Sequence, residues 1–167
     1  MTDNYVCRIA SLEEMHARWD YNIAAASKDR ENWIIWKSEN IDQFIRGLII
    51  PYYGLLDGEV ICECTAVISP EALSDPEGLV DDRTAYLSAF RTSEGYRGKG
   101  YFSRLFRFML DDLRRRGYEN VTLGVEPEET ENKEIYRHLG FLTHIKDAVD
   151  VYPDGTRIDV EYYGKEL

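Results

Sequence analysis

The stretch EGYRGKGYFSRLF, Glu94–Phe106, joins a basic, glycine-rich turn to the start of an amphipathic segment. Gly98 and Gly100 lack Cβ atoms, so an anion can approach the main chain closely there. The first N–H groups of a helix have no partner within the helix, and they lie at the positive end of its dipole. Arg97 and Lys99 add positive charge beside them. This composition therefore predicts a phosphate-binding turn at a helix N-terminus.

The segments on either side of the turn have the patterns of a strand and a helix. Residues 84–90, TAYLSAF, form a short apolar run that is typical of a strand and leads directly into the turn. After the turn, apolar side chains recur at helical spacing, at Phe102, Leu105, Phe106, Met109 and Leu113. Gly117 follows a basic stretch and is typical of the residue just beyond a helix C-terminus. The turn is therefore predicted to connect a strand to the most strongly patterned helix of the chain.

Two common nucleotide-binding motifs do not fit the turn. Gly95 and Gly100 have the glycine separation of a Walker loop, but Tyr101 and Phe102 stand where that motif needs Lys and then Ser or Thr. Ser103 stands where the dinucleotide fingerprint needs its third glycine. The sequence therefore excludes both of these nucleotide sites.

The rest of the chain predicts a single α/β domain over residues 1–167, since no repeat and no long linker divides it. Ser11 with Glu14 forms a capping box at the start of a predicted helix, and Asp57-Gly58 predicts a hairpin. The expected strands are 5–10, two within 52–69, 84–90, 120–126 and two after 141 around the turn at 153–155. The expected helices are 11–27, a weaker one at 39–47, one from 102, and 131–140. Residues 70–83 are expected to form a loop.

Composition limits where the protein acts and what it binds. The chain has no signal-peptide pattern, no apolar run of membrane-spanning length, and three cysteines, Cys7, Cys62 and Cys64, which do not form a disulfide framework. These features predict a cytoplasmic protein. A net charge of −11 argues against nucleic acid and anionic membranes as partners. Residues 97–116 are the exception, with seven basic and two acidic side chains.

With its strand–turn–helix order, the segment Arg97-Gly98-Lys99-Gly100-Tyr101-Phe102 resembles the signature of the GNAT superfamily of N-acetyltransferases, Arg/Gln-x-x-Gly-x-Gly/Ala. A second segment, Tyr136–Phe141, resembles the family's Tyr-x-x-Leu-Gly-Phe. The resemblance covers roughly residues 84–141. It implies a single-domain GNAT-like α/β fold, with a mixed central β-sheet flanked by helices on both faces.

The same resemblance implies acetyl-coenzyme A as cosubstrate. No metal is expected, because the three histidines lack metal-ligand spacing and Cys62-x-Cys64 has no second cysteine pair. The implied cofactor-binding residues are Phe90, Arg91, Arg97, Gly98, Lys99, Gly100, Tyr101, Phe102, Glu129 and Tyr136. In the family two parallel strands splay apart, and a main-chain N–H near Phe90 or Arg91 would stabilise the oxyanion. Two positions depart from the pattern, because Phe102 replaces a small residue and Glu129 stands where many relatives have asparagine.

Acetyl transfer to an amine needs a proton donor for the departing thiolate and a route for the proton that the amine loses. The resemblance implies Tyr136 as the donor, with its hydroxyl near the coenzyme sulfur. An alkylamine has a pKa of about 10.4, so a base must take its proton at neutral pH. Glu63, alone among apolar neighbours in a predicted strand, is the first candidate base, and Glu94 is the second.

The acceptor is expected to be a primary amine of a small molecule, and the acidic remainder of the chain favours a cationic one. Trp33 and Trp36 are interpreted either as core residues or as part of the acceptor wall, since N-terminal helices line that site in the family. Alternative functions are a catalytically silent coenzyme-A-binding sensor, a protein or peptide N-terminal acetyltransferase and a non-enzymatic phosphate-binding domain. A homodimer is compatible with the sequence, which does not decide the oligomeric state.

Overall fold

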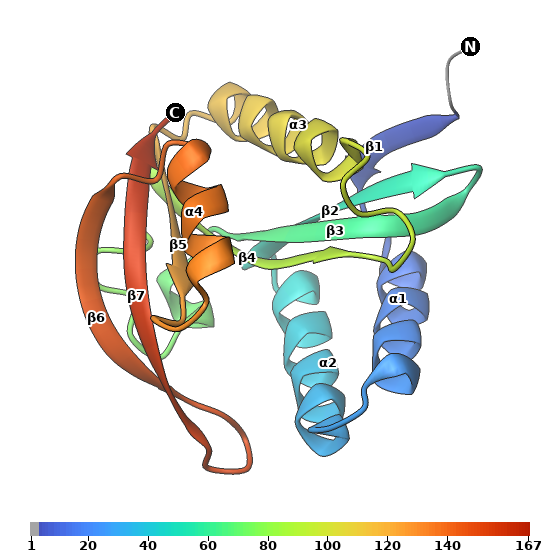
Figure 1. Cartoon of the computed structure of the whole chain (residues 1–167), viewed down its shortest axis with the longest axis horizontal. Helices are drawn as coiled ribbons and strands as arrows, with labels where there is room; N and C mark the ends of the chain where they lie inside the picture. The colour runs from blue at the N-terminus through green and yellow to red at the C-terminus, as the bar shows by residue number, and fades with distance from the viewer. Residues whose placement is uncertain (1–3) are drawn as a thin grey trace.

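A computed structural model describes residues 4–167 and shows a mixed α/β architecture (Figure 1). The strands are β1 (Tyr5–Ile9), β2 (Ile49–Leu56), β3 (Glu59–Val67), β4 (Thr84–Thr92), β5 (Asn120–Val125), β6 (Thr143–Val151) and β7 (Arg157–Glu166). The helices are α1 (Leu12–Ala25), α2 (Arg30–Ile45), α3 (Tyr101–Arg115) and α4 (Thr130–His138), with a short 3-10 turn at Pro70–Ala72.

The strands form one seven-stranded sheet in the order β1-β2-β3-β4-β5-β7-β6. Every neighbouring pair is antiparallel except β4 and β5, which are parallel. Helices α3 and α4 cover one face, and α1 and α2 cover the other (Figure 1). The predicted mixed sheet with helices on both faces is confirmed.

Helix α3 is held to the sheet by its apolar stripe. Leu105, Met109 and Leu113 are completely buried, and each such side chain stabilises the fold by roughly 1.5–3 kcal/mol relative to exposure. The Tyr52 hydroxyl of β2 donates a 2.6 Å hydrogen bond to Asp112 and fixes the C-terminal half of the helix. Packing along the whole helix therefore holds its N-terminus in a defined place above the sheet.

Helix α2 begins nine residues before the predicted segment 39–47. Ile34 and Ile35 are β-branched and exposed, so the local sequence gives only a weak helix signal. The helix is stabilised instead by tertiary contacts, since the Trp33 ring lies 6.0 Å from Trp19 of α1 and the Trp36 ring 5.0 Å from Tyr152. The predicted boundary was wrong because these partners are distant in sequence.

A bulge in β4 separates it from β5. Pairing between the two parallel strands ends at Leu87 and Leu123. Just beyond, the β3–β4 register shifts so that Cys64 of β3 faces two β4 residues, Ala89 and Phe90, and Ala89 adopts a left-handed φ of 59°. β4 then bends away from β5 (Figure 1), which opens the splay that the family resemblance implies.

Replacing Gly54 of β2 by alanine should destabilise the fold. A Cβ there would lie 2.0 Å from the Tyr5 hydroxyl and 2.8 Å from the Cys62 sulfur, both inside the core. We expect Gly54→Ala to lower the free energy of unfolding by about 1–3 kcal/mol, measured by urea denaturation. Adding Tyr5→Phe, which removes the nearest atom, should make the double variant more stable than additivity predicts; simple additivity would contradict the overpacking explanation.

Candidate functional site

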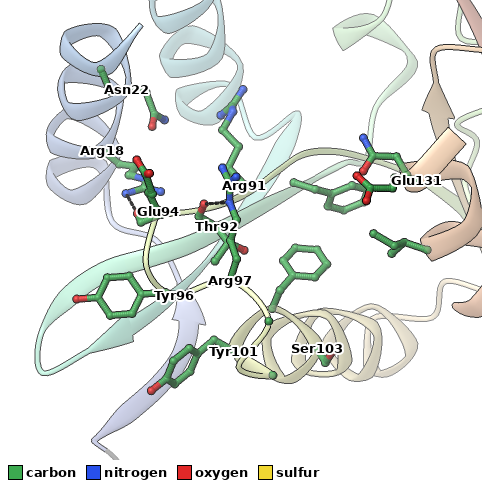
Figure 2. Close-up of a pocket in the computed structure, with 18 of the residues that line it drawn as sticks. Arg18, Asn22, Arg91, Thr92, Glu94, Tyr96, Arg97, Tyr101, Ser103 and Glu131 are labelled. Atoms are coloured by element: carbon green, nitrogen blue, oxygen red, sulfur yellow. Dashed lines mark hydrogen bonds between the residues drawn. The ribbon is translucent and has the colours of Figure 1, made fainter. Parts of the chain in front are cut away.

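A cavity of about 800 Å³ lies where the end of β4, the N-terminus of α3, α4 and α1 meet (Figure 2). We call it the first cavity. Eight of the predicted cofactor-binding residues border it: Phe90, Arg91, Arg97, Gly98, Gly100, Tyr101, Phe102 and Tyr136. The other two, Lys99 and Glu129, are not among its lining residues. The structure therefore brings together the two segments that carry the sequence resemblance.

The N-terminus of α3 opens into the first cavity with its main-chain donors available. Gly98 and Gly100 have φ values of 73° and 84°, and no side chain among residues 4–167 caps the helix at Gly100. Nothing lies within 4 Å of a Cβ built at either glycine, so the backbone conformation rather than lack of space requires glycine. Successive N–H groups in such a turn form an anion-binding concavity. The donor set fits a diphosphate.

Arg97 is placed at this turn by a contact with the strand that precedes it. Its Nε donates a 3.1 Å hydrogen bond to the Thr92 carbonyl, while the rest of the side chain is exposed at the cavity (Figure 2). Lys99 is exposed but does not border the cavity. Arg97 is thus the better positioned of the two cations to meet an anion.

Phe102, which departs from the family signature, packs inward. Its ring lies 5.6 Å from Phe90 in an edge-to-face contact and 6.1 Å from Phe106 in a stacked contact. The helical stripe predicted this inward orientation. The ring also forms part of the apolar wall of the first cavity and does not replace the donors of the turn.

Tyr136 on α4 lines the first cavity. Its ring lies 5.7 Å from Phe90, and burial, with a smaller contribution from the Glu129 charge, raises the pKa of its phenol to about 12. A raised pKa means that the hydroxyl keeps its proton at every pH below that value. Tyr136 is therefore a hydrogen-bond donor at neutral pH and not a base.

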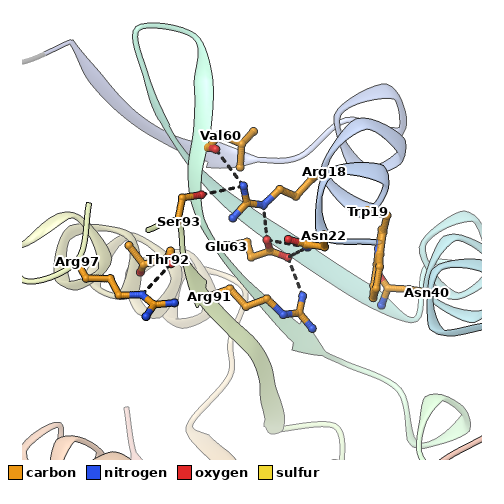
Figure 3. A network of polar contacts seen from close by, with 10 residues as sticks. All are labelled: Arg18, Trp19, Asn22, Asn40, Val60, Glu63, Arg91, Thr92, Ser93 and Arg97. Carbon is orange, nitrogen blue, oxygen red and sulfur yellow. Dashed lines mark hydrogen bonds and ion pairs between the residues drawn. The ribbon is translucent and has the colours of Figure 1, made fainter. Parts of the chain in front are cut away.

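Glu63 lies in a network of buried donors between the sheet and α1 (Figure 3). The side chain is 7% exposed, and it accepts hydrogen bonds from the Arg18 Nε, from Arg91 at 2.9 Å and from Asn22 at 3.2 Å. Arg18 also donates to the Ser93 hydroxyl at 3.0 Å. The carboxylate does not border the first cavity, and two guanidinium groups compete for any proton-accepting lone pair.

Arg18 and Asn22 were not identified from the sequence. They lie four residues apart on α1, so both project from the same helix face, and both are at least nine-tenths buried. The four-residue spacing of these polar side chains was the feature of the sequence that could have identified them. Glu94, the second candidate base, is exposed and borders the first cavity (Figure 2).

A second cavity of about 570 Å³ contains the predicted acceptor residues Trp33 and Trp36. Arg91 borders both cavities, and its guanidinium carbon lies 4.7 Å from the centre of the Trp33 ring and 5.5 Å from that of Trp19. The two cavities therefore share Arg91, just after the bulge in β4, as a lining residue.

Residues 9–141, well over half of the chain, match the model of the Acetyltransferase (GNAT) family. The chain belongs to this family. A GNAT member is an acyltransferase, and acetyl-coenzyme A is the family's acyl donor. No curated protein sequence matches this GNAT chain significantly.

Solved structures share the GNAT fold at low sequence identity. A probable acetyltransferase from Staphylococcus epidermidis has a TM-score of 0.70 at 10% identity, with 98% of this chain and 99% of that chain covered. A putative acetyltransferase from Salmonella typhimurium, solved with its cofactor acetyl-CoA, has a TM-score of 0.65 at 19% identity (98% and 94% covered). A Salmonella typhimurium enzyme that modifies the N-terminal serine of ribosomal protein L7/L12 has a TM-score of 0.68 at 17% identity (100% and 96% covered).

The described helices of this GNAT protein include none with the length and apolar character needed to cross a bilayer. Residues 4–167 also contain no group of three or more His, Cys, Asp or Glu side chains arranged to hold a metal ion.

Charge reversal should show that Arg97 and Lys99 contribute differently to acetyl-CoA binding. We expect Arg97→Glu to weaken acetyl-CoA binding about tenfold to hundredfold, because it places a carboxylate where the diphosphate is expected to bind. Lys99→Glu, at a residue outside the lining, is the matched control and should weaken binding less than about threefold. Isothermal titration calorimetry measures both affinities, and equal effects would contradict the placement of the diphosphate.

Proposed function

We propose that this GNAT protein transfers the acetyl group of acetyl-CoA directly to the primary amine of a small, cationic acceptor. The observation that carries the proposal is the first cavity, which joins uncapped main-chain donors at one end to Tyr136 and the bulged end of β4 at the other. These are the groups needed to hold a diphosphate, protonate a leaving thiolate and stabilise charge on a carbonyl oxygen.

The residues proposed for the cofactor divide into two groups by task. The turn from Arg97 to Phe102 holds the diphosphate through main-chain N–H groups, with side-chain charge from Arg97, while Lys99 contributes through its main chain. Phe90 and Arg91 provide the main-chain N–H for the acetyl oxygen, where β4 has left β5. Glu129 precedes α4, and its carboxylate accepts a 3.2 Å hydrogen bond from Asn132, so we propose only an indirect contribution to the cofactor arm.

The proposed reaction moves one acyl group and one proton. The amine nitrogen attacks the thioester carbonyl carbon, the carbon–sulfur bond breaks, and the sulfur leaves with the bonding electron pair. The Tyr136 hydroxyl hydrogen-bonds to that sulfur and donates its proton to it, and the phenolate then takes a proton back from water, so that the net change is one proton moved from nitrogen to sulfur. A main-chain N–H near Phe90 or Arg91 stabilises the charge that develops on the carbonyl oxygen.

The proton that the amine loses has two proposed routes. Glu63 was the first candidate from sequence, but its oxygens are already occupied by donors from Arg18, Arg91 and Asn22. We therefore propose that Glu63 positions Arg91, and that Glu94, which borders the first cavity, accepts the proton through water.

The proposal is tested by mixing the protein with acetyl-CoA and a panel of amines while monitoring the release of free thiol. We expect turnover on at least one small cationic amine. Tight binding of acetyl-CoA without turnover on any amine would favour a coenzyme-A sensor. Equal affinity for acetyl-CoA and for a plain nucleotide diphosphate would favour a phosphate-binding domain.

Tyr136→Phe removes only the hydroxyl and should lower kcat by about a hundredfold, because the leaving thiolate loses its donor. The affinity for acetyl-CoA should change little, since the ring and its contact with Phe90 remain. Stopped-flow thiol release with calorimetry separates the two effects. Wild-type kcat would remove Tyr136 from the proposed chemistry.

The two carboxylates should differ in what their loss changes. We expect Glu94→Gln to lower kcat for thiol release about tenfold, because it removes the proposed proton acceptor, and to leave the KM of the amine nearly unchanged. Glu63→Gln should raise the KM of the amine as well, because it releases Arg91. Wild-type kcat in Glu94→Gln, with the loss of kcat found in Glu63→Gln alone, would make Glu63 the base that the sequence indicated.

A further inference from the structure

A row of aromatic rings in successive contact lines the second cavity. The rings come from Trp19, Trp33, Trp36, Tyr86, Tyr152 and Tyr162. Their centroids are 6.0 Å apart between Trp19 and Trp33, 5.7 Å between Trp33 and Trp36, and 5.0 Å between Trp36 and Tyr152. The wall therefore extends from Arg91, which lies over Trp33, to the β6–β7 turn.

We call the end of the cavity away from Arg91 the far end, and two carboxylates belong to it by their place in the chain. Glu39 lies one helical turn after Trp36 on α2, and Asp150 lies near the end of β6, two residues before Tyr152. Neither has an ion pair among residues 4–167, whereas the third bordering carboxylate, Asp75, pairs with Lys146 at 3.0 Å. Burial first, and the Asp150 charge second, raise the pKa of Tyr162, which agrees with a carboxylate close to the aromatic wall. The near end is positive, because Arg18 and Arg91 share the single carboxylate of Glu63.

Asn32 and Asp154 close the gap between α2 and the β6–β7 turn. Asn32 is only 2% exposed; its side chain donates to the Asp154 carboxylate at 3.2 Å and accepts from the Asp154 main-chain N–H at 3.1 Å. We call this pair the α2–turn clasp. An extended peptide passing between α2 and the turn would have to break these hydrogen bonds and leave the buried Asn32 amide without its partners, which costs more than making the bonds contributes.

We propose that the second cavity is the acceptor chamber and that it takes a small organic dication. The reactive primary amine lies at the Arg91 end, an apolar spacer lies along the tryptophans, and a second positive charge lies at the Asp150 and Glu39 end. This inference rests on the proposed function, because it takes the first cavity as the site of acetyl-CoA.

Each part of the dication matches a feature of the chamber. Aromatic faces and carboxylates both favour a cation at the far end. At the near end, the positive charge of Arg91 disfavours the protonated form of the reactive amine and so favours the neutral nucleophile. The α2–turn clasp favours a small molecule over a peptide chain.

The experiment compares diaminobutane with n-butylamine, which has the same carbon chain and one charge fewer. We expect kcat/KM for thiol release to be at least about tenfold higher for the diamine. The double variant Glu39→Gln/Asp150→Asn should abolish this preference by lowering kcat/KM for the diamine at least about tenfold, while acetyl-CoA affinity stays the same. Asp159→Asn is the matched control, since Asp159 is an exposed β7 carboxylate without an ion pair in the described chain and outside the cavity lining.

Binding can be followed without catalysis, because the chain has three tryptophans and all of them border the second cavity. Diaminobutane should change the intrinsic fluorescence of the wild type saturably, and the double variant should bind it at least about tenfold more weakly. A fluorescence response without turnover would support the chamber and overturn the proposed transferase function.

Three results would overturn the chamber while leaving the transferase function intact. They are equal kcat/KM for the two amines, a diamine preference that survives in the double variant, and preferential acetylation of a peptide with an N-terminal serine. The last result would assign the acceptor to a polypeptide and would require the α2–turn clasp to open. Circular dichroism melting of the double variant checks that it is folded, so a lost preference reports the charges.

Discussion

The bulge at Ala89 and Phe90 is the constraint on which the arrangement of the site depends. Because two β4 residues face the single Cys64 of β3, β4 changes direction and leaves β5 after Leu87. The gap exposes main-chain groups of β4 that a continuous parallel ladder would occupy. It also places Phe90 on the first cavity and Arg91 on both.

Arg91 joins the two halves of the proposed reaction. One side of its guanidinium reaches Glu63, and its planar face lies over Trp33, so the side chain is fixed by an ion pair and by a cation–π contact together. A lysine could not make both contacts in this geometry. The buried network around Glu63 thus fixes the position of the Arg91 guanidinium beside the proposed acceptor. The Glu63 carboxylate does this although it does not border the first cavity.

Features encoded locally were predictable from the sequence. The capping box at Ser11 and Glu14, the Asp57-Gly58 hairpin and the glycine turn before α3 each depend on residues within a few positions, and the structure contains all three. The start of α2 and the partners of Glu63 depend on contacts between distant residues. Arg18 lies 45 positions from Glu63, so no local pattern connects them.

The α2–turn clasp joins residues that are 122 positions apart in the chain. Ribosomal synthesis proceeds from the N-terminus, so α2 emerges long before its partner turn, and the tryptophan-lined wall stays incomplete until that turn has been made. Tyr152 and Asp154 follow β6 and therefore emerge after α3 and α4. A nascent chain arrested before this hairpin would therefore expose the tryptophans of α2 to water and to chaperones, even where the glycine turn and α3 had already formed.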